Sequence, residues 1–314
     1  MTGYIIRRFL QSLVVLLLVT LIMFAMFHML PGNPARAELG VHAQPAAVAA
    51  FDKLQGLDKP VWYQYYLYLD HLVHGNLGFS YVQNASVALL LAQRLPKSIL
   101  LVGLATVLAV IVAIPLGVMQ AVRRNKPEDY FFTGTSFVFY SFPTFWLGII
   151  LIEIFSIQAH WLPPEAPEGT NVGQILADWK GLVLPVLTLA LVSIAAYSRY
   201  MRSSMIESLA QDYIRTARAK GVSQKAVLLR HALRNSLIPM ATLIGLSLPA
   251  VLSGAVITES VFNYPGVGLL FYQSAQSNDF SVLLGLTLIA AVGVVVGNLI
   301  ADVLYAVLDP RIRY

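Results

Sequence analysis

Long apolar runs separated by short polar connections fill most of the chain. Six of these runs are long enough to cross a bilayer, because about 20 apolar residues in a helix span its hydrocarbon core. They comprise residues 9–30, 98–122, 131–157, 181–198, 236–258 and 280–308. Lipid offers no partners to backbone N–H and C=O groups, so each run is expected to be a helix. The pattern predicts an all-α, multi-pass membrane protein with six transmembrane helices.

Prolines inside several apolar runs predict kinked spans. Pro115, Pro143, Pro185 and Pro249 each remove one helical hydrogen bond, and packing against neighbouring spans makes this tolerable in a membrane. The first run follows two arginines, as in a signal peptide, but it is too long and lacks a small-residue cleavage site. We therefore expect a retained first helix.

Composition agrees with the membrane class and limits the domain organisation. Hydrophobic residues make up 57% of the 314 residues and charged residues 12%, far from the values of soluble domains. The mean hydropathy is +0.69. We expect a first helix with an outer loop at 1–97 and a five-helix transmembrane core at 98–314, which includes a cytoplasmic connection at 199–235. With no cysteine, disulfides and thiolate metal sites are excluded.

The distribution of basic residues predicts the orientation of the spans. With the N-terminus in the cytoplasm, fifteen of the 21 Lys and Arg residues lie on the cytoplasmic side and six lie outside. The positive-inside rule therefore places both termini in the cytoplasm. The outer connections are then residues 31–97, 158–180 and 261–279. This orientation explains the net charge of +5, so no nucleic-acid partner is expected.

The large outer connection contains an aromatic segment with helical spacing. Its apolar positions are Trp62, Tyr65, Tyr66, Leu69, Leu72 and Val73. A helix lying at the headgroup level is favoured, and a docking surface for an external partner is the alternative. His71 and His74 lie in the same segment, but no third ligand is near them in the sequence, so no metal site is expected.

The most polar connection, residues 199–235, carries a short basic segment between two apolar runs. Residues 211–219 are expected to form a helix that Gly221 ends with a positive φ angle. Binding of its arginines to anionic headgroups is one interpretation. That interpretation leaves unexplained a set of interleaved small and apolar residues, which suit packing in a groove of a partner. They are Tyr213, Ile214, Ala217 and Ala219.

Residues 212–221, with the run to Pro239, resemble the coupling loop of membrane-spanning permeases of ATP-binding cassette importers. The likeness is to the group that carries dipeptides, oligopeptides and nickel. Other matching segments are 30–34, 75–80, 142–146, 259–268 and 308–314. The resemblance covers nearly the whole chain. Two departures from the general loop pattern occur: Arg215-Thr-Ala replaces Glu-Ala-Ala, as is usual in the peptide group, and the distal proline, Pro239, falls late.

The resemblance implies the fold of a type I importer permease, the first of two permeases in a heterodimer in the bacterial inner membrane. It also implies two ATPase subunits that bind ATP and magnesium, an extracytoplasmic binding protein, and transport of dipeptides or oligopeptides, with nickel or glutathione as alternatives. No Gly-rich phosphate-binding loop occurs in the sequence, so no cofactor and no catalytic residue are expected in this chain. The residues implied to contact the ATPase are Asp212, Tyr213, Arg215, Thr216, Ala217, Arg218, Ala219 and Gly221. Within that contact, Ala217 and Gly221 are expected to need small side chains.

Three acidic residues, Glu153, Glu259 and Asp302, lie within or at the edges of spans and are candidates for a substrate path. A charge at the bilayer centre costs about 2.5–3.5 kcal/mol on insertion scales, so each is expected to face a cavity, a partner or the interface. For Glu153, contact with a peptide ammonium group and pairing at the headgroup level both remain open. Glu259 is assigned to folding the segment that follows it, with gating as the alternative. For Asp302, a hydrogen bond with Asn298 is favoured.

Two other function classes fit the sequence less well. An ion-coupled secondary transporter would also carry intramembrane carboxylates, but it usually shows internal repeats and has no basic coupling helix. An intramembrane enzyme needs a clustered constellation, such as paired aspartates or a metal-binding His-Glu helix, and the sequence contains none.

Overall fold

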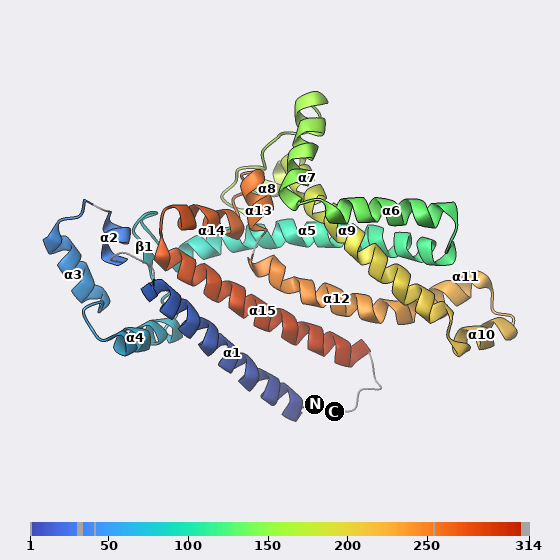
Figure 1. The fold of residues 1–314 in the computed structure, drawn as a ribbon, viewed down its shortest axis with the longest axis horizontal. Helices are drawn as coiled ribbons and strands as arrows, with labels where there is room; N and C mark the ends of the chain where they lie inside the picture. The colour runs from blue at the N-terminus through green and yellow to red at the C-terminus, as the bar shows by residue number, and fades with distance from the viewer. Residues whose placement is uncertain (1, 30–33, 41, 254, 309–314) are drawn as a thin grey trace.

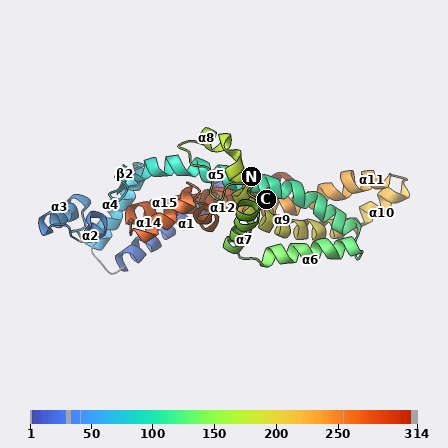
Figure 2. The same cartoon turned by 90° about the horizontal axis from the view of Figure 1, so that it is seen from above.

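The computed structural model describes residues 2–29, 34–40, 42–253 and 255–308, and most of them are helical. Figures 1 and 2 show an elongated bundle with α2 (Pro34–Leu39) near one end and α10 (Asp212–Ala219) at the other. The expected outer connection and the expected cytoplasmic connection therefore lie at opposite ends, as the predicted topology requires.

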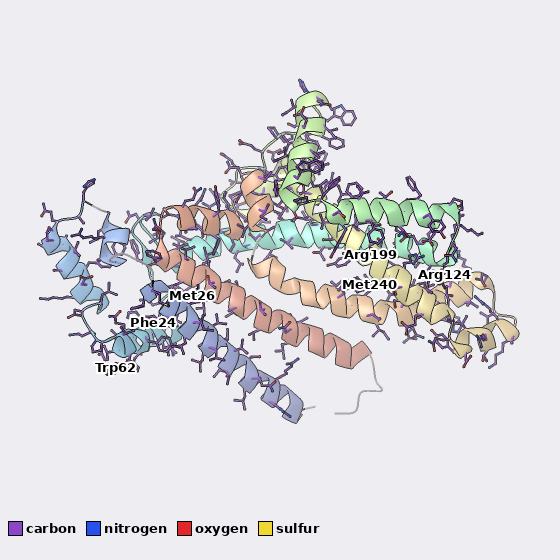
Figure 3. The ribbon with its side chains drawn as sticks, in the orientation of Figure 1. Phe24, Met26, Trp62, Arg124, Arg199 and Met240 are labelled. Carbon is purple, nitrogen blue, oxygen red and sulfur yellow. The ribbon has the colours of Figure 1, made fainter. Side chains whose placement is uncertain are left out.

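The N-terminal part forms one long helix and a group of short elements. Its elements are α1 (Thr2–Met29), α2, α3 (Pro45–Gln55), α4 (Val61–Val73), and the hairpin β1 (Phe79–Ser80) and β2 (Ala85–Ser86). The expected aromatic helix is confirmed as α4, and it packs on α1, where the Tyr65 hydroxyl lies 3.1 Å from Thr20 Oγ1. The Tyr65 ring also lies 5.2 Å from the Phe24 ring, while Trp62 is 73% exposed (Figure 3).

Helix α5 (Val87–Val122) begins earlier than the expected second span, which was placed at residue 98. The Ser86 hydroxyl accepts a hydrogen bond from the Leu89 N–H and caps the helix, as serine commonly does. The sequence predicts Lys97 at the end of a polar loop, yet this residue is only 5% exposed and lies within the helix. The expected boundary between residues 97 and 98 therefore falls inside α5, because tertiary contacts satisfy the charge that marked it.

The expected third span, residues 131–157, consists of two helices instead of one. Helix α6 (Pro127–Ser141) is followed by α7 (Thr144–Leu151), which the π-helix η1 (Ile152–Gln158) continues. The two halves are bent by 104° where Phe142 and Pro143 adopt extended backbone conformations. Proline disfavours helical geometry in the residue before it, so the chain leaves the helix at Phe142. The expected kink at Pro143 is confirmed as a full break between two helices, and α7 points away from the bundle in Figure 1.

The rest of the chain supplies the helices that complete the bundle. They are α8 (Val172–Ala177), α9 (Trp179–Leu209), α10, α11 (Gln224–Ala226), the π-helix η2 (Val227–Ala232), α12 (Leu233–Ser253), α13 (Val256–Val261), α14 (Val267–Gln276) and α15 (Phe280–Leu308). Pro185 lies inside α9 without ending it.

The bundle centre depends on close helix pairs. Helix α5 packs along α9, and a Cβ atom on Gly117 would lie 2.6 Å from the Met201 Cβ and 2.7 Å from the Ser198 carbonyl oxygen. Only glycine therefore allows this approach, as small residues do between membrane helices. Helix α12 packs along α15, and α1 lies beside α15 (Figure 1).

Within the described part of the chain, three helices are long and apolar enough to cross a membrane: α5, α9 and residues 280–300 of α15. A fourth crossing results if the bent pair formed by α6 with α7 and η1 is one span. The apolar part of α1, Leu10–Met26, is shorter. The structure thus shows a helical, multi-pass membrane protein, and the count of six spans stays a prediction.

Candidate functional site

Helix α10 is confirmed in the basic connection, and its C-terminal end has the expected geometry. The Gly221 N–H donates to the Arg218 carbonyl at 3.0 Å, and the Val222 N–H donates to the Ala217 carbonyl at 3.2 Å. Gly221 has φ +75°, as predicted, in the left-handed region that glycine adopts at helix ends. A Cβ atom there would have no neighbour within 4 Å, so the backbone angle, not lack of space, requires glycine.

Two side chains of α10 face the chain's own core. Ile214 is 0% exposed and Ala217 is 8% exposed, and both pack in a cluster with Met201, Met205 and Val227. The expectation that Ile214 and Ala217 form a surface for a partner is therefore wrong. Because the apolar stripe of an amphipathic helix faces the nearest core, these residues fix α10 to η2 and to the core cluster that includes side chains of α9.

The opposite face of α10 is polar and open. Its exposed residues are Asp212, Tyr213, Arg215, Thr216, Arg218, Ala219 and Gly221. Arg215 Nη1 lies 3.3 Å from Asp212 Oδ1, but the side chains are 76% and 92% exposed, so this ion pair contributes little to stability. The surface that α10 offers to another molecule is thus charged, with Tyr213 as its one large aromatic side chain.

Serines connect the two helices that carry α10. The Ser236 hydroxyl of α12 lies within hydrogen-bonding distance of two acceptors, the Ser208 hydroxyl at 2.9 Å and the Ser204 carbonyl at 3.2 Å. The Ser204 hydroxyl in turn donates to the Ser236 carbonyl at 3.1 Å. Sequence reasoning missed this contact, although serines on both sides of the expected helix 211–219 were a visible signal of close helix packing.

A buried ion pair, also missed from the sequence, fixes the same end of α9 to α6. Arg202 donates from Nε and Nη2 to the two carboxylate oxygens of Asp129, each at 2.7 Å. The Asp129 side chain is 2% exposed and also accepts from the Asn125 N–H at 3.0 Å and from the Thr133 hydroxyl at 3.2 Å. Such a bidentate pair is geometrically specific, so it sets how α6 and α9 meet.

Glu259 is fully buried in α13 and its carboxylate is saturated. Oε2 accepts from the N–H groups of Gly268 and Leu269 at 2.6 and 3.0 Å. Oε1 accepts from the Ser98 hydroxyl at 2.7 Å and the Ala255 N–H at 3.2 Å. This arrangement is the one expected of a residue that folds its own segment. With both oxygens occupied, Glu259 offers no free group to a passing substrate in this conformation.

The other two acidic candidates lie elsewhere. Glu153 is exposed on the π-helix η1, where its Oε1 accepts a hydrogen bond from Gln158 at 3.1 Å. Its role toward a peptide ammonium group stays a prediction. Asp302 belongs to α15, but its side chain lies outside the described part of the chain, as does any contact with Asn298. The structure therefore does not bring Glu153 and Glu259 together in one site.

Comparison with known proteins agrees with this architecture. Residues 113–314 match the family described as "Binding-protein-dependent transport system inner membrane component", and residues 1–102 match the N-terminal part of such components. The chain is 42% identical over 316 residues to the oligopeptide transport system permease protein AppB of Bacillus subtilis, covering all of both chains.

A second relative is also a transport permease protein that is similar over its full length. The chain is 37% identical over 314 residues to the glutathione transport system permease protein GsiC of Escherichia coli strain K12, again covering all of both chains. The resemblance to permeases of ATP-binding cassette importers is thereby confirmed, and these relatives are transport subunits, not enzymes. The chain belongs to the family of inner membrane components of binding-protein-dependent transport systems.

Proposed function

We propose that this chain is a permease subunit of an ATP-driven importer of short peptides. The 42% identity over full length to an oligopeptide permease supports the substrate class, and the relative named for glutathione, itself a tripeptide, lies in the same range. Glutathione import is therefore the second candidate, and nickel is a weaker one. The chain would cross the inner membrane six times with both termini in the cytoplasm, as the excess of basic residues on that side favours.

The observation that carries the proposal is the way in which α10 is attached to the bundle and exposes its charged face. Its apolar stripe is fixed to the bundle through Ile214 and Ala217, while its charged face is open at the end of the molecule expected to lie in the cytoplasm. A rigidly mounted, solvent-facing charged helix suits contact with a soluble ATPase. Movement of that ATPase would then be transmitted through α9 and α12, which the serine contacts join.

The proposed assembly contains this chain, a homologous second permease, two ATPase chains and an extracytoplasmic binding protein. ATP and magnesium would be bound by the ATPase chains, and α10 of each permease would seat on one of them. An ion-coupled secondary transporter, the alternative class, would need none of these partners. Its signature would be loss of uptake on collapse of the proton gradient while ATP is preserved.

The test is ATP hydrolysis by the complete complex reconstituted in nanodiscs. Arg218→Glu reverses a charge on the open face of α10, and we expect it to remove most of the ATPase stimulation caused by peptide-loaded binding protein. The matched control is Arg124→Glu, the same charge change on the exposed connection between α5 and α6 (Figure 3). Equal activity of the Arg218→Glu complex and wild type would contradict the assignment of α10 to the ATPase contact.

A further inference from the structure

A pocket lies between α5, the connection before α8, and the turn joining α13 to α14, which come together in Figure 1. Its volume is about 440 Å³, within the range of roughly 300–1,000 Å³ typical of small-ligand sites. Three charged side chains, Arg94, Lys97 and Glu168, line it together with amides such as Gln93 and Asn263. In the proposed orientation this pocket opens at the outer end of the bundle.

Lys97 ties two walls of the pocket together. Its ammonium group donates to the Gly169 carbonyl at 2.6 Å, which holds the connection carrying Glu168 against α5. The Lys97 carbonyl accepts from the Tyr264 hydroxyl at 2.7 Å, which joins α5 to the α13–α14 turn. The charge of Lys97 is therefore committed largely to the protein itself.

Two further hydrogen bonds fix the third wall. The Val267 N–H donates to the Ser98 hydroxyl at 2.8 Å, and the Ala166 N–H donates to the Phe262 carbonyl at 2.8 Å. Each bond joins different elements of the pocket wall. The pocket is thus formed before any ligand arrives, which lowers the entropy lost on binding.

Arg94 and Glu168, in contrast, carry charges without bonded partners. In the part of the chain that the structure describes, neither side chain forms a hydrogen bond or an ion pair, although Arg94 is half-buried. The Glu259 carboxylate attracts Arg94 electrostatically, but its oxygens already accept four hydrogen bonds from other groups. The guanidinium fork of Arg94 is therefore free for a carboxylate, which it matches in geometry.

We propose that this pocket is an entry subsite for a short zwitterionic peptide, whose carboxylate binds Arg94 and whose ammonium group binds Glu168. The proposal rests on the function proposed above and names where the peptide first contacts this chain. An acidic side chain of the binding protein is the other source of a carboxylate. It would satisfy Arg94 but leave Glu168 unmatched, so a ligand with both charges fits the pocket better.

The test measures equilibrium binding of radiolabelled dialanine to the complete importer complex in nanodiscs, without the binding protein. Competition by N-acetyl-dialanine and by dialanine amide reports each peptide end separately. We expect Arg94→Gln to weaken dialanine binding at least tenfold and to abolish the preference for free carboxylate over amide. Glu168→Gln should abolish only the preference for the free amine. Lys180→Gln, an exposed cation outside the pocket, is the control and should change neither preference.

Three results would overturn the proposal. The first is the absence of saturable dialanine binding to the wild-type complex. The second is that both variants keep the preference for a free carboxylate and for a free amine. In the third, Arg94→Gln weakens binding of the peptide-free binding protein, and no dialanine binding is detected. The last result would assign the carboxylate to the binding protein. Peptide-stimulated ATP hydrolysis by the wild-type complex separates the two claims: if stimulation persists while dialanine binding is absent, the entry subsite fails and the importer function stands.

Discussion

Two short helical segments, α10 and the α13–α14 corner, are held by contrasting means. Helix α10 buries only Ile214 and Ala217 and leaves its charges in solvent. The α13–α14 corner buries its charge, since Glu259 is surrounded by backbone N–H groups and the Ser98 hydroxyl. The first is the surface that we propose for the ATPase contact, and the second is a closed structural joint. A charge near a span therefore indicates function only where its polar atoms remain free.

Removing the Glu259 carboxylate from the α13–α14 corner should cause the largest loss of stability. Glu259→Ala leaves the N–H groups of Ala255, Gly268 and Leu269 buried without an acceptor, and each such group costs about 1–3 kcal/mol. We expect the free energy of unfolding to fall by about 3–5 kcal/mol in total, as for other broken buried charge sites. The measurement is an SDS titration of the detergent-solubilised complex.

Glu259→Gln is the matched control for this joint. It keeps the shape and one acceptor oxygen but turns an NH₂ group toward backbone donors, so we expect about half the loss caused by Glu259→Ala. If Glu259→Ala were as stable as wild type, the joint would not depend on this carboxylate, and a role for Glu259 in gating would regain support.

The next largest effect should come from the ion pair that joins α6 to α9. Arg202→Ala leaves the Asp129 carboxylate, 2% exposed, without its bidentate partner, and we expect a loss of about 2–3 kcal/mol. Asp129→Ala should cost less, because the Arg202 side chain is 27% exposed and can reach solvent. A double-mutant cycle checks the pairing: additive losses would show that the two residues act independently.

Features that depend on neighbouring residues could be predicted from the sequence, whereas features that depend on residues far apart in the chain could not. The existence of α10, the positive φ of Gly221 and the break at Pro143 are local properties of a few neighbouring residues, and all three are confirmed. The 104° bend at that break was not predictable, because packing of α7 against α9 and α13 sets the angle.

Long-range contacts explain the errors at the candidate site. The sequence predicts a partner contact for Ile214 and Ala217, because a stripe of apolar residues does not reveal which core it faces. Asp129 and Arg202 are 73 residues apart in the chain, so their pairing could not be derived from spacing. The sequence predicts Lys97 in a loop, because its acceptor, the Gly169 carbonyl, comes 72 residues later and cannot be identified from spacing.

A smaller effect on stability is expected at the end of α10. Gly221→Val forces a β-branched residue into φ +75°, which costs about 1–2 kcal/mol, although open space surrounds the position. The strain should tilt or fray α10 and remove peptide-stimulated ATP hydrolysis while the complex still assembles. Gly221→Asn is the control, because asparagine tolerates this conformation, and it should retain most activity. A fully active Gly221→Val complex would show that the geometry of this helix end is unimportant for coupling.

The smallest effect on stability is expected for a substitution on the open face of α10. Arg215→Ala removes an ion pair with Asp212 whose side chains are 76% and 92% exposed, so the free energy of unfolding should change by less than about 0.5 kcal/mol. The same substitution should lower the affinity of the complex for its ATPase chains, measured by pull-down across a salt series, because a surface charge that contributes nothing to folding is free to contribute to binding. The loss should shrink as salt rises, since screening weakens exposed charge contacts. A clear loss of stability with unchanged ATPase binding would instead assign Arg215 to the fold, and α10 would then resemble the closed joint at Glu259.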